Sequence, residues 1–196
     1  MTGRTILIMK QPNALRKMSL IVAVDSKYGI GKNNALPWML RKDMKFFVEN
    51  TTKTTDPAKV NAVIMGRKCW ESIPKKFRPL KDRLNVVITR TLPEYRDDNL
   101  IISQNFDEIV NELISGTLSE KVEKVWNIGG GEIYRMALEK DYVKELLVTK
   151  IQKDFDADIF LTGVEWDRFQ EDESARSELM TENGLDFTFH RYCYVE

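Results

Sequence analysis

Short, continuously apolar segments alternate with helical segments along most of this chain. The segment 19–24 (SLIVAV) is apolar at nearly every position, and 61–65 (NAVIM) has the same character. Such runs are typical of strands that are buried on both faces. Between them, segments such as 106–114 repeat apolar residues at helical spacing. Alternating strands and helices predict a mostly parallel sheet with helices on both faces.

The expected elements follow one another in a regular order. Strands are predicted at 19–24, 61–65, 84–89, 100–103, 124–128 and 146–151, and helices at 40–48, 68–73, 106–114 and 132–138. The tail 186–195 alternates apolar and polar residues, which predicts an antiparallel edge strand with His190 facing solvent. Ligands of parallel sheets bind beyond the carboxyl ends of the strands, so those ends are the places to search for a site.

The composition fits one globular domain of 196 residues, 42% of them apolar. The 30 Lys and Arg residues balance 30 Asp and Glu residues, so a cationic surface for nucleic acid is not expected. No apolar run approaches the ~20 residues that span a bilayer. With Cys69, Cys193 and one histidine, the chain has too few ligands for a His/Cys metal site. We therefore expect no metal, membrane or nucleic acid, and a reducing, cytoplasmic environment.

Residues 1–17 differ from the rest of the chain. They contain four basic residues and no acid, and the first acid of the chain is Asp25. A mitochondrial targeting presequence is one interpretation of such a segment. A short surface extension is the favoured alternative, because the segment is short and contains few hydroxyl residues. The sequence therefore predicts a basic N-terminal extension over 1–17 and a domain over 18–196.

Two apolar strands run directly into glycine and then into a helix. Gly129, Gly130 and Gly131 follow one of them, and Gly66 precedes the basic pair 67–68 after the other. A helix N-terminus has unpaired N–H groups, and glycine lets a phosphate approach the backbone. Neither junction is a P-loop or a G-x-G-x-x-G motif. Glycine turns also serve close packing alone, but two such junctions with arginines nearby favour a phosphorylated ligand.

Asp43 occupies an unusual position for a carboxylate. On the predicted helix 40–48 it lies on the apolar face, with Leu40, Met44 and Phe47 as neighbours. Removing a carboxylate from water costs several kcal/mol or raises its pKa. Asp43 is therefore a candidate proton donor or a partner for a cationic ligand. The alternative is that it lies at the edge of this face, solvated or paired with a basic neighbour.

Four segments combine these features: IVAVDSKYGIGKNNALPW at 21–38, AVIMGRKCWESIPKKFRPLKDRLNVVITR at 62–90, WNIGGGEIY at 126–134 and LLVTKI at 146–151. In this order they resemble the dihydrofolate reductase family, in its eukaryotic, monofunctional form. The resemblance implies a single α/β domain with an eight-stranded, mostly parallel sheet, an antiparallel C-terminal strand and helices on both faces. It also implies NADPH-dependent reduction of 7,8-dihydrofolate to tetrahydrofolate for one-carbon metabolism and thymidylate synthesis, and inhibition by antifolates. A monomer is the default expectation.

The resemblance assigns roles around the substrate. Asp43 takes the place of the acid that binds the pterin ring and favours protonation of N5 while hydride reaches C6, and Thr149 supports it. Arg83 would bind the glutamate α-carboxylate, which suits a bidentate guanidinium. Leu36, Trp38 and Tyr134 are the other residues placed at the reacting ring. The folate pocket would be lined by Ile21, Val22, Ala23, Met44, Phe47, Ser72, Ile73, Phe77, Leu80 and Ile128.

The resemblance also assigns the cofactor site to the two glycine junctions. Gly129 and Gly130 would abut the nicotinamide and be joined by a cis peptide. Residues 28–34 would form a mobile loop that closes over the nicotinamide, with freedom supplied by Gly29 and Gly31. Arginines near both junctions would neutralise the 2′-phosphate and favour NADPH over NADH. The assigned residues are Ala23, Ile30, Gly31, Gly66, Arg67, Lys68, Cys69, Thr89, Arg90, Gly129, Gly130, Gly131, Glu132 and Ile133.

Some positions depart from the pattern of the family, and other functions stay open. Cys69 stands where a Thr or Ser is usual, which removes one hydroxyl contact near the pyrophosphate. Met44 and Phe77 replace other residue types at the pocket, which bears on inhibitor fit. A pyrimidine-type reductase of riboflavin synthesis would share the fold but lack Asp43 and Arg83. A catalytically silent folate- or dinucleotide-binding module and a nucleic-acid binder are the remaining alternatives.

Overall fold

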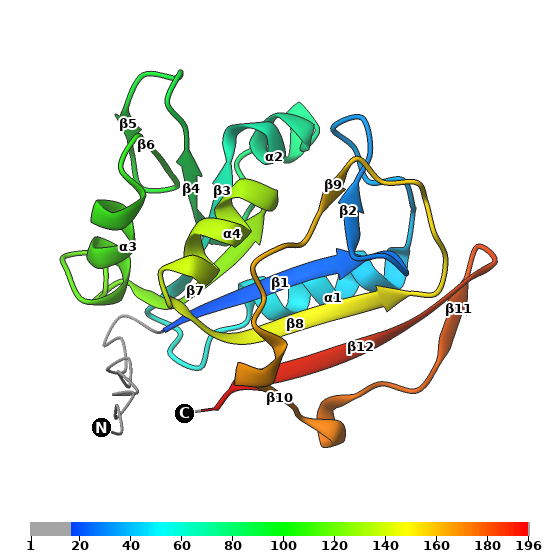
Figure 1. Ribbon diagram of the computed structural model, residues 1–196. Coiled ribbons are helices and arrows are strands. Elements are labelled where there is room, and N and C mark those ends of the chain that lie inside the picture. The colour runs from blue at the N-terminus through cyan, green and yellow to red at the C-terminus, as the bar shows by residue number, and fades with distance from the viewer. Residues whose placement is uncertain (1–16, 196) are drawn as a thin grey trace, which may run out of the picture.

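Six parallel strands form the middle of the molecule, as the apolar runs predict (Figure 1). The computed structural model describes residues 17–195. In spatial order the parallel strands are β8 (Val143–Ile151), β1 (Met18–Val24), β7 (Val122–Gly129), β3 (Val60–Gly66), β4 (Arg83–Ile88) and β6 (Leu100–Ser103). Except in β6, most of their side chains are buried on both faces, which explains the nearly continuous apolar runs.

Antiparallel strands extend this sheet at both edges. At one edge β12 (Leu185–Tyr194) pairs with β8, and β10 (Phe169–Glu171) and β11 (Met180–Glu182) pair with β12. At the other edge β5 (Tyr95–Arg96) pairs with β6. The sheet therefore has ten strands in the described residues, and the expected number of eight was too low. The extra strands are two or three residues long, too short to show an alternating pattern.

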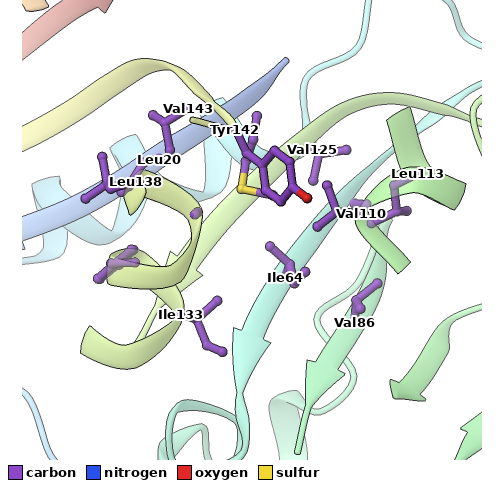
Figure 2. Packing of buried hydrophobic residues seen from close by; sticks show 14 of the residues in the cluster. Leu20, Ile64, Val86, Val110, Leu113, Val125, Ile133, Leu138, Tyr142 and Val143 are labelled. Atoms are coloured by element: carbon purple, nitrogen blue, oxygen red, sulfur yellow. The ribbon is translucent and has the colours of Figure 1, made fainter. Parts of the chain in front are cut away.

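Helices cover both faces of the sheet, as the sequence predicts. The helices are α1 (Arg41–Thr52), α2 (Arg67–Ser72), α3 (Phe106–Ile114) and α4 (Gly131–Glu139), and the 3-10 turns are Lys75–Phe77, Trp166–Arg168 and Glu173–Ala175. Side chains of α3 and α4 pack on one face with Leu20 and Ile64 (Figure 2). Side chains of α1 and α2 pack on the opposite face with Ile21 and Trp126. The first strand thus contributes successive residues to two separate cores.

Strand β12 differs from its expected pattern. Leu185 and Phe187 are buried on one face, but His190 and Tyr192 are buried on the other. The change arises because the 3-10 turn Trp166–Arg168 covers the second face, with the rings of Trp166 and Tyr192 5.2 Å apart. The expectation that His190 faces solvent was therefore wrong. Its Nδ1 lies 2.6 Å from a carboxylate oxygen of Glu171, and burial lowers its pKa.

The predicted basic extension can be compared with the structure only at its end. Strand β1 begins at Met18, where the domain was expected to begin. Residues 1–16 lie outside the described residues, so the interpretation of 1–17 stays a prediction. Between residues 17 and 195, none of the helices is both long and apolar enough to cross a membrane. Across the same range, no three His, Cys, Asp or Glu side chains gather into a possible metal site.

Candidate functional site

Asp43 lies in the first turn of α1 and meets Thr149 of β8. The Thr149 hydroxyl donates a hydrogen bond to Asp43 Oδ1 over 2.6 Å. Burial raises the pKa of Asp43, the bond from Thr149 opposes that rise, and the negative charge of Glu182 adds to it. Among the described residues no ion pair joins Asp43 to Arg41 or Lys45, and Lys45 pairs with Glu49 instead. The structure thus holds a half-buried carboxyl group in a fixed orientation.

Trp38 and Tyr134 are both buried, but their polar atoms differ. The indole N–H of Trp38 has no hydrogen-bond acceptor among the described residues, although the side chain is only 7% exposed. A buried donor without an acceptor is costly, so this N–H fits a site that receives a polar ligand atom or water. The Tyr134 hydroxyl instead donates to the carbonyl of Ile21 over 2.8 Å. Burial raises the pKa of Tyr134 well above its usual value, so it braces the site and is no proton source.

Several side chains expected to line the folate pocket lie in the apolar cluster between the sheet and helices α1 and α2. Ile21 belongs to this cluster, and the residues packed against it include Phe47, Ile73, Leu80 and Ile128. Ala23 continues this face of the sheet beside Trp38. Val22 does not, because successive strand residues point to opposite faces and its side chain lies in the core with α3 and α4. Only the backbone of Val22, and not its side chain, can therefore line the expected pocket.

Three of the predicted pocket residues are largely exposed. Leu36, Met44 and Phe77 have 54%, 51% and 55% of their surface exposed. Large exposed apolar side chains are available for contact with a ligand. The hydroxyl of the exposed Ser72 donates to the carbonyl of Cys69 and can still accept from a ligand.

Arg83 is a buried cation at the start of β4. Its Nη1 donates to the Thr51 hydroxyl over 2.8 Å, and its Nε donates to the carbonyl of Lys81. The guanidinium also lies 5.8 Å from the ring centre of Phe47. Burial lowers the pKa of Arg83, yet a guanidinium stays charged in any protein environment. The negative charge of Asp82 acts on Arg83, but no ion pair joins the guanidinium to an acid in the described part of the chain, so a ligand carboxylate fits here.

The glycine junction after β7 has room for a ligand. The peptide between Gly129 and Gly130 is cis, as the resemblance implies. Gly129 has a φ of +97°, and a Cβ there would lie 2.7 Å from the ring of Tyr134. A Cβ on Gly130 would meet nothing within 4 Å, although this residue caps α4. Open space beside unpaired helix N–H groups fits an anionic group, so these residues suit the diphosphate of a dinucleotide.

The basic residues of the predicted cofactor site lie near acids of the same protein. Arg67 donates to both carboxylate oxygens of Glu71 over 2.8 and 2.9 Å. Arg90 is 86% exposed, and its Nη2 lies 3.9 Å from Glu132. Lys68 is exposed beside them. A phosphate bound here would therefore replace surface carboxylates as the partner of these arginines.

Two further cofactor assignments involve groups that are already bonded. The hydroxyl of Thr89 accepts from the backbone N–H groups of Thr91 and Leu92, which shapes the turn after β4. The Cys69 thiol points to the carbonyl of Ile128 at 3.6 Å, and burial raises its pKa to about 11. Cys69 is thus a neutral packing group between the two glycine junctions.

The loop over 28–34 contains strand β2 (Gly29–Gly31), which pairs with β9 (Ile159–Phe160). Gly29 and Gly31 do not have positive φ, so their predicted role in loop freedom has no support in their conformation. A Cβ on Gly29 would lie 2.3 Å from the Cβ of Ala157, so close packing requires this glycine. A Cβ on Gly131 would contact Ile30 and Ile159, which brings this loop to the start of α4.

Three buried polar residues of the site escaped prediction. Thr51 orients Arg83, as described above. Asn127 accepts from the N–H of Gly129 and donates to the carbonyl of Ile133, and thereby braces the glycine junction. Asp25 accepts from the N–H groups of Lys27, Gly29 and Phe155, and so fixes the start of the loop. Asn127 and Asp25 could have been found as single polar residues within or directly after apolar strands.

Comparison with known proteins agrees with this geometry. The family model described as "Dihydrofolate reductase" matches residues 17–193. A protein of Caenorhabditis elegans is 43% identical over 187 residues, which are 93% of this chain and 99% of that protein. The dihydrofolate reductase of Heliothis virescens is 38% identical over 90% of this chain and 96% of its own length. That of Rattus norvegicus is 37% identical over 91% and 97%.

Proposed function

The chain belongs to the dihydrofolate reductase family, and we propose that it reduces 7,8-dihydrofolate with NADPH, by hydride transfer to C6 and protonation of N5. The enzyme itself is a dihydrofolate reductase, which converts dihydrofolate to tetrahydrofolate. The observation that carries the finer proposal is the half-buried carboxyl of Asp43, fixed at 2.6 Å by Thr149 beside an apolar wall.

Asp43 has the chemistry that recognition of a pterin requires. The N3–H and 2-amino group of the ring are two parallel donors, and a carboxylate offers two acceptors in matching geometry. The bond from Thr149 to Oδ1 sets the orientation of this carboxylate. Because burial raises the pKa of Asp43, its carboxyl group stays protonated to a higher pH than that of an ordinary aspartate. We therefore assign to Asp43 both ring binding and the support of N5 protonation.

Arg83 supplies the second point of substrate recognition. Its guanidinium is held by Thr51 and forms no ion pair among the described residues, although the charge of Asp82 acts on it. A carboxylate at the tail of the substrate would complete its coordination. Between Asp43 on α1 and Arg83 on β4 lies the apolar cluster that contains Phe47 and Leu80. A rigid ring at one end and an anionic tail at the other describe the folate class of substrates.

NADPH, when bound, supplies the hydride. The residues that would hold it are the glycine junctions, with Gly130 open beside the start of α4. Arg67, Lys68 and Arg90 would neutralise the pyrophosphate and the 2′-phosphate. Trp38 and the loop over 28–34 would exclude water from the reacting rings.

The test is a spectrophotometric assay with the purified chain, dihydrofolate and NADPH, followed at 340 nm. Activity that requires both reagents supports the proposal. Oxidation of NADPH with a riboflavin-pathway pyrimidine and not with dihydrofolate would favour the rival reductase. Tight binding of both ligands without turnover would instead identify a silent binding module.

The cellular setting is part of the same proposal. We propose a cytoplasmic monomer that serves one-carbon metabolism and thymidylate synthesis and that antifolates inhibit. If the protein is a monomer, light scattering should give the mass of one chain, 22.8 kDa. A reporter fused to residues 1–17 should stay diffuse in the cytosol, and concentration in mitochondria would show that this segment targets the enzyme there. Zero net charge supports the expectation that nucleic acid is no partner.

A further inference from the structure

The turn between β11 and β12 holds the first turn of α1. The Glu182 carboxylate accepts from the backbone N–H groups of Arg41 and Lys42 over 2.8 and 2.9 Å. The Asn183 amide donates to the carbonyl of Met39 over 2.8 Å. Helix α1 has no cap from the side chain of its own N-cap residue, Leu40. The start of this helix is therefore capped by residues about 140 positions later in the chain.

This cap lies directly beside the substrate-binding part of α1. Asp43 follows Lys42, and its partner Thr149 pairs in the sheet with Phe189 of β12. Phe46, one turn further along α1, stacks on Phe189 with ring centres 4.0 Å apart. The turn lies at the end of the sheet where β1 and β8 finish (Figure 1). The hairpin of β11 and β12 thus contacts α1 on both sides of Asp43.

We infer that Glu182 is a positioning residue for the reduction: it fixes the first turn of α1 and places a negative charge near the carboxyl group of Asp43. The inference rests on the proposed function of Asp43. Glu182 does not touch the substrate in this assignment. It acts through the helix that presents Asp43, Met44 and Phe47 to the pocket.

Electrostatics around Asp43 support a functional part for this charge. Three elements contribute groups that interact with the carboxyl group of Asp43. These groups are the Thr149 hydroxyl of β8, the Glu182 carboxylate of β11 and the Tyr134 hydroxyl of α4. Tyr134 stays neutral because it is buried. Arg41 and Lys42 on α1 itself interact with Glu182, whose pKa they lower. Glu182 is thus ionised at neutral pH and disfavours ionisation of Asp43.

The experiment compares the parent enzyme with Glu182→Gln and, as matched control, Asp186→Asn. Asp186 is an acid of the same hairpin whose side chain bonds to Thr181 and not to α1. In Glu182→Gln the pH at which hydride transfer declines should fall by about half a pH unit, since the neighbouring negative charge is lost. The KM for dihydrofolate should rise severalfold, and amide hydrogen exchange at Arg41 and Lys42 should accelerate about fivefold. NADPH affinity and every property of Asp186→Asn should stay near the parent values.

Asn183→Gly separates position from charge, because it removes the bond to Met39 and leaves the carboxylate in place, and glycine accepts the φ of 53° at this position. It should raise the KM for dihydrofolate without moving the pH profile. The inference is overturned if Glu182→Gln leaves the pH profile, the KM and the exchange of both amides unchanged, or if Asp186→Asn shifts the profile equally. Failure of the proposed function is separate: the parent enzyme would then lack turnover, while amide exchange would still report whether Glu182 caps α1.

Discussion

The proposed substrate side and the proposed cofactor side of the site hold their charges in opposite ways. On the substrate side Arg83 is buried and Asp43 is half-buried, and each is oriented by a threonine, Thr51 or Thr149. The cofactor side relies on surface charges such as Arg90, which is 86% exposed. Its arginines lie beside acids of the same protein and not beside neutral hydroxyl groups.

This difference teaches how each ligand is selected. A buried charge that is oriented only by a neutral hydroxyl needs an oppositely charged or hydrogen-bonding group of the ligand as its partner. A substrate without that group leaves the charge without a partner, which costs binding free energy. An exposed ion pair is worth only about 0–1 kcal/mol, so a phosphate replaces one weak partner by another. We therefore expect large, specific effects of changes on the substrate side, and smaller, salt-dependent effects on the cofactor side.

The largest effect is expected from Asp43→Asn. Hydride transfer at pH 7 should fall by about 10²–10⁴-fold, the range that a positioned acid or base contributes. Part of the loss should return at low pH, where the substrate carries its own proton. The measurement is single-turnover oxidation of NADPH across a pH series.

The same variant should not lose stability. Because burial raises the pKa of Asp43, ionising this group in the folded state costs free energy. That cost is absent below the ordinary pKa of aspartate and grows as pH rises through the raised pKa. Asp43→Asn removes it, so its Tm at pH 7 should equal or exceed that of the parent. Near-normal turnover at pH 7 would remove Asp43 from the mechanism, and a large drop in Tm would show that it serves the fold.

The second effect concerns the substrate tail. Arg83→Leu should weaken dihydrofolate binding by roughly 10–150-fold, because hydrogen bonds to charged groups contribute about 1.5–3 kcal/mol. Small diaminopyrimidine inhibitors without a glutamate tail should bind almost as tightly as to the parent. Equal losses for both ligand types, measured by fluorescence titration, would refute the carboxylate assignment.

Thr51 gives a more graded test of the same arrangement. Thr51→Val should weaken dihydrofolate binding by about tenfold, because the Arg83 guanidinium loses the hydroxyl that orients it. Thr51→Ser keeps the hydroxyl and should restore most of the affinity. If the two variants behave alike in titrations of dihydrofolate, the hydroxyl has no part in orienting Arg83.

The sequence was informative where a pattern repeats and weak where a contact joins distant segments. Helix 106–114 was predicted with the observed ends, because its apolar face repeats at helical spacing. The placement of Asp43 on an apolar face came from the same periodicity, while its role and that of Arg83 came from family resemblance. Contacts such as Thr51 with Arg83, or Glu182 with the start of α1, could not be predicted because no local pattern encodes them. The error at His190 has the same origin, since a distant turn covers that face of β12.

On the cofactor side we expect smaller effects that depend on salt. Arg67→Leu and Arg90→Leu should each raise the KM for NADPH by about fivefold, since an exposed contact to phosphate contributes little at physiological ionic strength. The KM for NADH should change less, because NADH lacks the 2′-phosphate. Steady-state kinetics at low and high salt measure both. Equal changes for NADPH and NADH would assign the arginine to the pyrophosphate or to the fold.

The smallest effect is a gain. Glu132 lies 3.9 Å from Arg90 at the start of α4, where the proposed diphosphate would bind. Glu132→Gln frees Arg90 and removes a negative charge from an anion site, so NADPH affinity should rise about two- to threefold at low salt. The gain should vanish at high salt, where exposed charges are screened. Glu139→Gln is the control, because it removes the same charge from another surface ion pair, with Arg135 on the same helix, away from the glycine junction. Isothermal titration of the three proteins with NADPH decides between the outcomes. An equal gain in Glu139→Gln would mean that the change in net charge, and not the release of Arg90, strengthens binding. A loss in Glu132→Gln would mean that Glu132 organises the cofactor site and does not compete with the cofactor for it.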